Sequence, residues 1–336
     1  ACNKLKPYLF NYIMKTIEHF VYGKPFSGES KKVGKIFNPA TGDQEAEVKL
    51  ATTKDVNVAV TNAQKAFEAW SNKPPLQRAR VMFKFKELIE KNSDELTKII
   101  VAEHGKVYED AKGSLTRGLE VVEYACGIPQ MLKGEFTENV GSSVDSWSIR
   151  QPLGVCAGIT PFNFPAMVPM WMFPMAIACG NTFILKPSER DPSVPVELAK
   201  LMIEAGLPAG VLNVVHGNKE VVDGILDHQT IKAVSFVGSS DIANYVYERG
   251  ARAGKAPAGA DAGVAGADRD NFHSHPGTHC EAGSGLVPDG RDRGTEARSM
   301  RHHRGRLHGE VFRSRGGESG RWPARRLLLG RAFRRR

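Results

Sequence analysis

Apolar and polar positions follow one pattern before residue 151 and another after it. Residues 17–50 alternate apolar and polar positions between turn signals such as Asn38-Pro39, which predicts short antiparallel strands. Beyond them, apolar residues recur at helical spacing in several stretches, so we expect this part to be mostly helical. The expected helices are 53–70, 75–89, 93–104 and 115–126.

From residue 151 the chain alternates short apolar segments with helical ones. The expected strands are 154–160, 182–185, 211–215 and 233–237, and the expected helices are 167–178, 194–205, 220–227 and 242–249. Successive strand–helix units form a parallel sheet covered on both faces, so the expected fold class is α/β, with the N-terminal helices and strands packed around the sheet. Ligands of such sheets bind beyond the carboxyl ends of the strands.

The loops at these strand ends are 160–165, 186–190, 216–218 and 238–240. Gly238 and Ser239 precede a helix, whose N–H groups and positive dipole end attract a phosphate. Lys186 and Glu189 lie across a turn and can grip ribose hydroxyls. Alternatively, Gly238 is an ordinary turn glycine, and Lys186 with Glu189 is a solvated pair. Because no G-x-G-x-x-G fingerprint is present, the residues alone indicate an anion- or nucleotide-binding domain and nothing more specific.

Three phrases in these loops resemble one known family. They are ITPFNFP at 159–165, ILKPSER at 184–190 and SFVGSSDIA at 235–243. In this order they resemble the aldehyde dehydrogenase superfamily, and within it the CoA-acylating methylmalonate-semialdehyde dehydrogenase branch. The same branch is supported by FNPATGDQEAEV at 37–48, AEHGK at 102–106 and RGLEVVEYACGIPQMLKGE at 117–135. The resemblance covers about residues 15–255.

The resemblance implies an NAD site built from these loops. Lys186 and Glu189 would hold the adenosine ribose with Arg190 beside it, and Ser239 would contact the pyrophosphate. The implied cofactor-binding residues are Thr160, Phe162, Lys186, Glu189, Arg190, Gly238 and Ser239.

Two further residues have implied roles at the substrate. Asn163 would donate its amide N–H to the oxyanion that develops during the reaction, although an Asn at this place can also cap the next helix. Arg117 would hold a substrate carboxylate, which suits the planar guanidinium fork; the alternative is an exposed helix Arg.

The resemblance also implies the reaction. A Cys thiolate attacks malonate or methylmalonate semialdehyde, hydride passes to NAD, and coenzyme A takes the acyl group to give acetyl-CoA or propanoyl-CoA, with CO₂ lost. The family's nucleophile segment follows the Ser239 loop, and this chain has no match to it. Cys280 is the only later cysteine, and its neighbours differ from that segment. The activity of this chain is therefore in question.

Two other functions stay open at this point. One is an NAD-dependent aldehyde dehydrogenase that hydrolyses the acyl group rather than transferring it to coenzyme A. The other is a non-catalytic chain that binds nucleotides or nucleic acids. Cys126, Cys156 and Cys179 precede the cofactor loops in apolar surroundings, where a thiol is usually inert.

Charge separates the C-terminal part from the rest. Residues 251–336 contain 17 Arg and 1 Lys against 9 acidic residues, so they hold the whole net charge of +9. They are rich in Gly and Ala and keep no hydrophobic period, which favours an out-of-frame, disordered tail. A basic arm that binds nucleic acid is the alternative, but its scattered aromatic residues offer little base stacking. Three His near Cys280 are irregularly spaced, so no metal site is expected.

These patterns divide the chain into four parts. Residues 1–13 are expected to be a leader before a natural start at Met14, and 14–150 a helical and strand segment. Residues 151–255 hold the NAD-binding repeats, and 256–336 form the tail.

Composition also bears on the surroundings of the protein. Five scattered cysteines argue against a disulfide framework or zinc site and fit a reducing compartment, so we expect a cytoplasmic protein. No apolar run reaches the ~20 residues that span a bilayer. An aldehyde is the expected partner. Family members form homo-oligomers, which is doubtful for this chain without the nucleophile segment.

Overall fold

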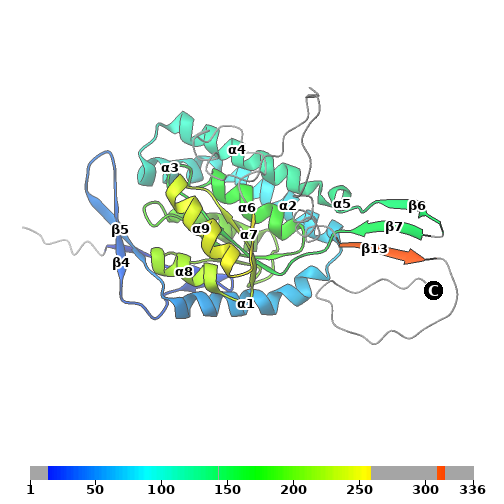
Figure 1. Cartoon of the computed structure of the whole chain (residues 1–336). Coiled ribbons are helices and arrows are strands. Elements are labelled where there is room, and N and C mark those ends of the chain that lie inside the picture. The colour runs from blue at the N-terminus through cyan, green and yellow to red at the C-terminus, as the bar shows by residue number, and fades with distance from the viewer. Residues whose placement is uncertain (1–13, 143, 259–308, 315–336) are drawn as a thin grey trace, which may run out of the picture.

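Figure 1 shows the computed structural model, which describes residues 14–142, 144–258 and 309–314. Its centre is a seven-stranded sheet with the order β12-β11-β8-β9-β10-β2-β3. The strands from β12 to β10 run parallel, and β2 and β3 are antiparallel additions at one edge. These strands are β2 (His19–Val21), β3 (Lys24–Phe26), β8 (Val155–Ile159), β9 (Thr182–Lys186), β10 (Leu212–Val214), β11 (Ile231–Phe236) and β12 (Ala256–Ala258).

The direction of strand addition reverses between β8 and β11. From β8 the chain moves to β9 and β10 through the helices α6 (Met167–Ala178) and α7 (Ser193–Glu204). It then returns past β8 to β11 and β12 through α8 (Lys219–Asp227) and α9 (Ser240–Arg252). Because crossovers between parallel strands are right-handed, this reversal moves the second pair of helices to the opposite face of the sheet. The expected α/β fold with a parallel sheet is confirmed.

Alternate residues of β9 enter two different apolar cores. Phe183 and Leu185 pack in the larger core, with Phe173 of α6. Ile184, between them, packs in the smaller core with Ile225 of α8. A strand with apolar side chains on both sides is typical of a parallel sheet covered by helices on both faces.

Five helices form most of the N-terminal part. They are α1 (Thr53–Ser71), α2 (Pro75–Lys91), α3 (Ser93–His104), α4 (Tyr108–Cys126) and the short α5 (Ile128–Met131). Thr52 and Asp55 form a capping box at the start of α1, and Gly105 ends α3 in the left-handed conformation (φ 82°). The helix that we expected from residue 115 begins earlier, at Tyr108. Its first turns bury only Ala111 and Ser114, so they lack the apolar period by which a helix is predicted from the sequence.

Two smaller sheets complete the described structure. One has the order β1-β5-β4 and consists of β1 (Lys15–Ile17), β5 (Gln44–Lys49) and β4 (Val33–Phe37). The other joins β6 (Phe136–Gly141), β7 (Val144–Ile149) and β13 (Gly309–Ser314), and it projects from the body of the molecule (Figure 1).

Parts of the chain that carried sequence expectations lie outside the described residues. These parts are the leader at 1–13 and most of the tail at 256–336, including Cys280. Within the tail, the stretches that are described are the strands β12 and β13. In the described part of the chain, no helix combines the length and the apolar character needed to cross a membrane.

Candidate functional site

The reversal between β8 and β11 places two loops side by side at the carboxyl edge of the sheet. Ile159 ends β8, and the chain continues through 160–166 into α6. Phe236 ends β11, and the chain continues through 237–239 into α9. The N–H of Val237 donates to the carbonyl oxygen of Ile159 at 3.2 Å, so the strands stay paired up to the start of both loops. Open α/β sheets bind ligands at such a switch point.

The loop after β8 is buried where it begins. The N–H of Thr160 donates to the carbonyl oxygen of Lys186 at 3.1 Å and joins this loop to the end of β9. The Thr160 side chain is buried, and its Oγ1 has no hydrogen-bond partner among the described residues. A buried hydroxyl costs free energy unless a ligand or a water molecule satisfies it. Phe162, two residues on, is 47% exposed.

Asn163 is not a helix cap. The N-cap of α6 is Ala166, and no side chain makes a capping hydrogen bond there. Asn163 is exposed, and its backbone carbonyl oxygen accepts a hydrogen bond from Lys106 Nζ at 2.9 Å. The geometry therefore excludes the capping alternative for this residue.

Two cations lie over the ring of Phe164, next to Asn163. Lys106 Nζ is 4.3 Å from the ring centroid, and the Arg117 guanidinium carbon is 5.9 Å from it. Burial lowers the pKa of Lys106, and the charge of Arg117 is a further lowering influence. Arg117 on α4 therefore does not stand alone, because it and Lys106 both lie beside the loop that contains Asn163.

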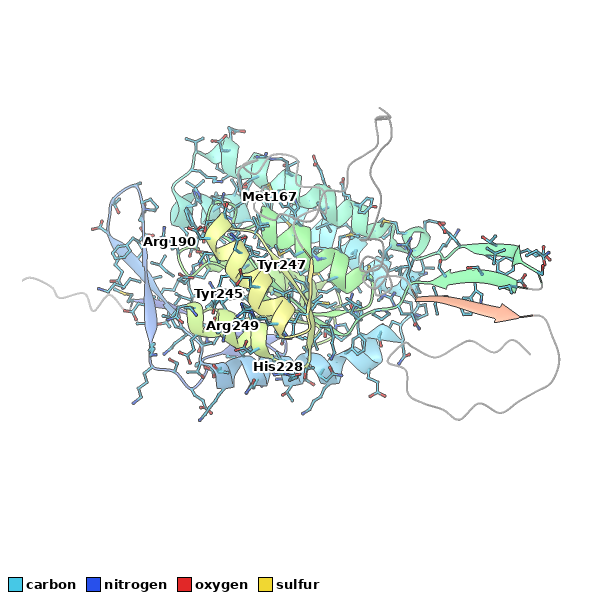
Figure 2. The ribbon with its side chains drawn as sticks, viewed as in Figure 1. Met167, Arg190, His228, Tyr245, Tyr247 and Arg249 are labelled. Carbon is cyan, nitrogen blue, oxygen red and sulfur yellow. The ribbon has the colours of Figure 1, made fainter. Side chains whose placement is uncertain are left out.

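The loop after β9 contains an ion pair of unequal exposure. Lys186 Nζ lies 3.0 Å from Glu189 Oε2, and the two side chains are 9% and 43% exposed. Because the ammonium is buried, it holds the more exposed carboxylate in one place, unlike a solvated pair with both side chains in water. The neighbouring Arg190 (Figure 2) places its guanidinium carbon 4.9 Å from the ring centroid of Phe162, and the ring of His104 stacks on Phe162 with centroids 6.4 Å apart.

In the loop after β11, the ring of Phe236 fills the space beside Gly238 that a side chain would need. A Cβ on Gly238 would lie 2.4 Å from Cζ of Phe236, which is closer than real contacts allow. Ser239 is exposed and is the N-cap of α9, with extended backbone (φ −70°, ψ 155°), and its side chain makes no capping hydrogen bond. The loop thus places the start of α9 at the switch point. The Ser239 side chain does not cap the positive end of the dipole of this helix.

The loop after β10, the fourth that the sequence singled out, is used for packing. His216 is fully buried, and its N–H donates to Nδ1 of His19 at 3.1 Å. The two imidazole rings have centroids 5.6 Å apart. Burial lowers the pKa of His216 to about 3 and that of His19 to about 4, so both rings are neutral at pH 7.

A family model for the aldehyde dehydrogenase family matches residues 26–263. The chain belongs to the aldehyde dehydrogenase family. Its switch-point loops are therefore those of an aldehyde dehydrogenase fold, as the motifs in the sequence predicted.

Individual relatives indicate which members of the family this chain resembles. A malonate-semialdehyde dehydrogenase of Pseudomonas aeruginosa is 55% identical over 242 residues, which are 72% of this chain and 48% of that protein. The mitochondrial acylating methylmalonate-semialdehyde dehydrogenase of Arabidopsis thaliana is 51% identical over 239 residues, 71% of this chain and 39% of the relative. The chain thus spans about half the length of the curated relatives it matches.

Solved structures with a similar fold carry names from the same group of enzymes. A Sinorhizobium meliloti protein, described as a methylmalonate-semialdehyde dehydrogenase and solved in complex with NAD, has a TM-score of 0.72 and 56% identity. The match covers 73% of this chain and 50% of that one. The methylmalonate-semialdehyde dehydrogenase of Oceanimonas doudoroffii has a TM-score of 0.71, also at 56% identity, with the same coverage.

The cysteines among the described residues of this aldehyde dehydrogenase domain are unsuited to nucleophilic attack. Cys156, in β8, is buried, and burial raises its pKa to about 12. Burial also raises the pKa of Cys179 and of Cys126. Since the thiolate is the reactive form, all three are poor nucleophiles at neutral pH. Cys280 lies outside the described residues.

Two buried carboxyl groups lie behind the exposed loops. Both carboxyl oxygens of Asp191 lack a hydrogen-bond partner among the described residues, and burial raises the pKa of Asp191 to about 8. Glu103 Oε2 accepts the N–H of Ser193 at 3.0 Å, and burial raises its pKa as well. Both carboxyl groups line a cavity of about 450 Å³ together with Phe162 and Arg190.

Sequence reasoning missed Lys106 and Asp191 as members of the site. Each stands next to a quoted motif residue, Lys106 at the end of AEHGK and Asp191 directly after KPSER. The Gly105 helix end and the Lys after it were the available signal for Lys106, because a helix end followed by a loop can deliver a side chain to a neighbouring element.

Proposed function

We propose that this chain binds NAD at the switch point between β8 and β11, for the oxidation of malonate or methylmalonate semialdehyde to an acyl-CoA. The observation that carries the proposal is the ion pair of Lys186 and Glu189 after β9, at the same edge of the sheet as the Gly238 loop after β11, in a domain 56% identical to a protein solved in complex with NAD. The acylating relative from Arabidopsis thaliana supports coenzyme A as the acyl acceptor.

The residues present fit a dinucleotide. Glu189 offers a carboxylate held by a buried ammonium, which suits two ribose hydroxyls as donors. Gly238 and Ser239 lead into α9, and the N–H groups at the start of a helix suit a phosphate. The buried Oγ1 of Thr160 gains a partner if a polar ligand atom enters the crevice.

The roles on the substrate side follow from charge and position. Arg117 and Lys106, both beside the loop of Asn163, attract the carboxylate that distinguishes these semialdehydes from simple aldehydes. The Asn163 amide donates to the oxygen of the aldehyde as negative charge develops on it. NAD, when bound, supplies the acceptor for the hydride that leaves the aldehyde carbon.

The described residues do not supply the nucleophile of the reaction. Burial raises the pKa of Cys126, Cys156 and Cys179, and it raises that of Cys156 to about 12. Any turnover by this chain therefore requires a thiol outside the described residues, and Cys280 is the one to test.

The proposal is tested by calorimetric titration of the 336-residue chain with NAD, followed by NADH formation from malonate semialdehyde with and without coenzyme A. Binding of NAD at one site per chain is the expected result. Acyl-CoA formation that disappears in Cys280→Ser would place the nucleophile in the tail. Failure to bind NAD would overturn the proposal, whatever the tail contributes.

A further inference from the structure

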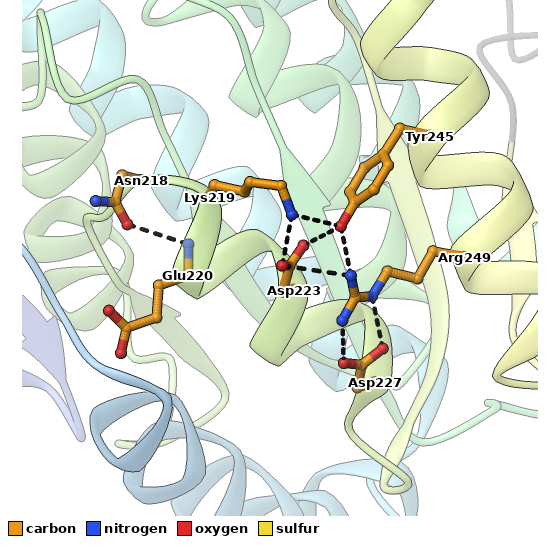
Figure 3. A network of polar contacts seen from close by, with 7 residues as sticks. All are labelled: Asn218, Lys219, Glu220, Asp223, Asp227, Tyr245 and Arg249. Carbon is orange, nitrogen blue, oxygen red and sulfur yellow. Dashed lines mark hydrogen bonds and ion pairs between the residues drawn. The ribbon is translucent and has the colours of Figure 1, made fainter.

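A connected polar network joins α8 to α9, the helix that begins after Ser239 (Figure 3). Lys219, the first residue of α8, donates to Asp223 and to the hydroxyl of Tyr245, at 2.7 Å in both cases. Arg249, one turn beyond Tyr245 on α9, contacts Asp227 with two nitrogens at 2.8 and 2.6 Å. The network therefore runs along the two helices from the start of α8 to its last residue.

The hydroxyl of Tyr245 is the centre of this network. It accepts from Lys219 and from Arg249, and it donates to Asp223 Oδ1 at 2.5 Å. A phenol has one donor and two acceptor positions, and all three are used here. Its ring also lies 4.6 Å from Lys219 Nζ in a cation–π contact. Removing this oxygen atom would break three hydrogen bonds at once, and Asp223 would then be the remaining link between Lys219 and Arg249, at 2.7 and 3.3 Å.

The position of α9 depends on polar contacts to an unusual degree. Within α9, only Val246 and Gly250 are buried, whereas the shorter α8 buries Val221, Gly224, Ile225 and Leu226. Apolar burial is the main force that fixes a helix on its sheet, so α9 has a weak apolar anchor. Charge-assisted hydrogen bonds between the two helices are then a larger share of what holds α9 in place.

We propose that Tyr245 is a positioning residue for the dinucleotide. Together with the ion pairs of Arg249, its hydroxyl ties α9 to the well-anchored α8 and so helps to hold the Gly238–Ser239 start of α9 at the place where the pyrophosphate binds. This inference rests on the proposed function, since it assigns a supporting element to the same site. Tyr245 acts through the helix and does not itself touch the cofactor.

The test uses Tyr245→Phe, which removes the oxygen and keeps the ring. The full chain is titrated with NAD at 25 °C, and the dissociation constant is expected to rise about three- to tenfold, the loss expected from one net hydrogen bond. Hydrogen exchange of the amides in the first turn of α9 is expected to become faster, while that of α8 stays unchanged.

Glu248→Gln is the matched control on the same helix. Glu248 pairs with Arg252 at 3.6 Å across an exposed surface, outside the network. The NAD dissociation constant of this variant is expected to stay within about twofold, because exposed ion pairs contribute little. Asp223→Asn, which weakens the network from α8, is expected to reproduce the loss seen in Tyr245→Phe.

The outcomes separate the inference from the function on which it rests. If the unchanged chain does not bind NAD, the proposed function fails and takes this inference with it. If the unchanged chain binds NAD and Tyr245→Phe binds it equally well, only the inference is overturned. A lower melting temperature with an unchanged dissociation constant would assign Tyr245 to stability alone and would also overturn it.

Discussion

The loops after β10 and β11 are built alike but are used differently. Each follows a parallel strand and begins a helix on the same face of the sheet. After β10, the Asn218 side chain caps α8 by accepting the N–H of Glu220 at 3.1 Å, and His216 is buried against His19. After β11, Ser239 is exposed and makes no such cap.

The difference teaches how to separate a binding loop from a packing loop. A packing loop satisfies its helix start from within the protein, as the Asn218 side chain does for the N–H of Glu220. A binding loop leaves its helix start without a side-chain cap, as Ser239 does. Buried polar atoms without a partner do not separate the two loops, because among the described residues Nδ1 of His216 lacks a partner as Oγ1 of Thr160 does. An uncapped helix start leaves its positive dipole end available to an anion.

The largest expected effect comes from neutralising Asp191. Its pKa is raised to about 8 in the folded state from 3.8, so between these values the folded state holds a proton that the unfolded state has lost. Stability therefore falls as pH rises through this window. Asp191→Asn removes the penalty, and its gain in unfolding free energy is expected to grow with pH, by up to about 1.4 kcal/mol per unit.

Urea unfolding at pH 5, 6.5 and 8 checks this dependence. Glu103 and Glu189 are the other acidic groups that face Asp191, and both remain in the variant. Asp43→Asn, in the exposed turn between β4 and β5, makes the same change of side chain at the surface and is the matched control. A gain for Asp191→Asn that does not change with pH would mean that Asp191 is ionised in the folded state.

The second effect compares the two helix starts directly. In Ser239→Asp, a carboxylate occupies the start of α9, where it favours the helix dipole but repels a bound pyrophosphate. At ~5 Å and an effective dielectric constant of ~20, the repulsion is about 3 kcal/mol per charge, so the NAD dissociation constant is expected to rise at least about a hundredfold. Calorimetric titration measures it.

Asn218→Asp is the control for this experiment. It adds the same charge at the start of α8, and its oxygen can still accept the N–H of Glu220. NAD affinity is expected to change little there. Equal losses in the two variants would mean that the loops do not differ in function, and the contrast between them would be lost.

Local patterns in the sequence predicted much of this structure. Strand and helix periods from residue 151 onward predicted the parallel sheet, because both periods are set by the backbone within a few residues. They could not show that His216 faces His19, which is 197 positions earlier in the chain. The same limit applies to Lys106 and Asn163, which meet only because α3 ends beside the loop after β8. The polar partner of a loop is a tertiary property.

The smallest of these effects concerns the choice of cofactor at the loop after β9. Glu189→Gln keeps the shape of the side chain beside Lys186 Nζ but removes its charge. Two consequences are expected. A charged acceptor for the ribose hydroxyls is replaced by a neutral one, so the NAD dissociation constant should rise about three- to tenfold. Repulsion of a phosphate on the 2′-hydroxyl also disappears, so NADP should bind more tightly than before.

The ratio of the two affinities is therefore the sharper measurement, because a general loss of structure would weaken both cofactors together. Nicotinamide mononucleotide, which lacks the adenosine ribose, is the matched control ligand and should bind the variant and the unchanged chain equally. If NAD and NADP lose affinity in parallel, Glu189 does not face the adenosine ribose. The ion pair with Lys186 would then serve to hold the loop after β9, and that loop would join the one after β10 as a packing element.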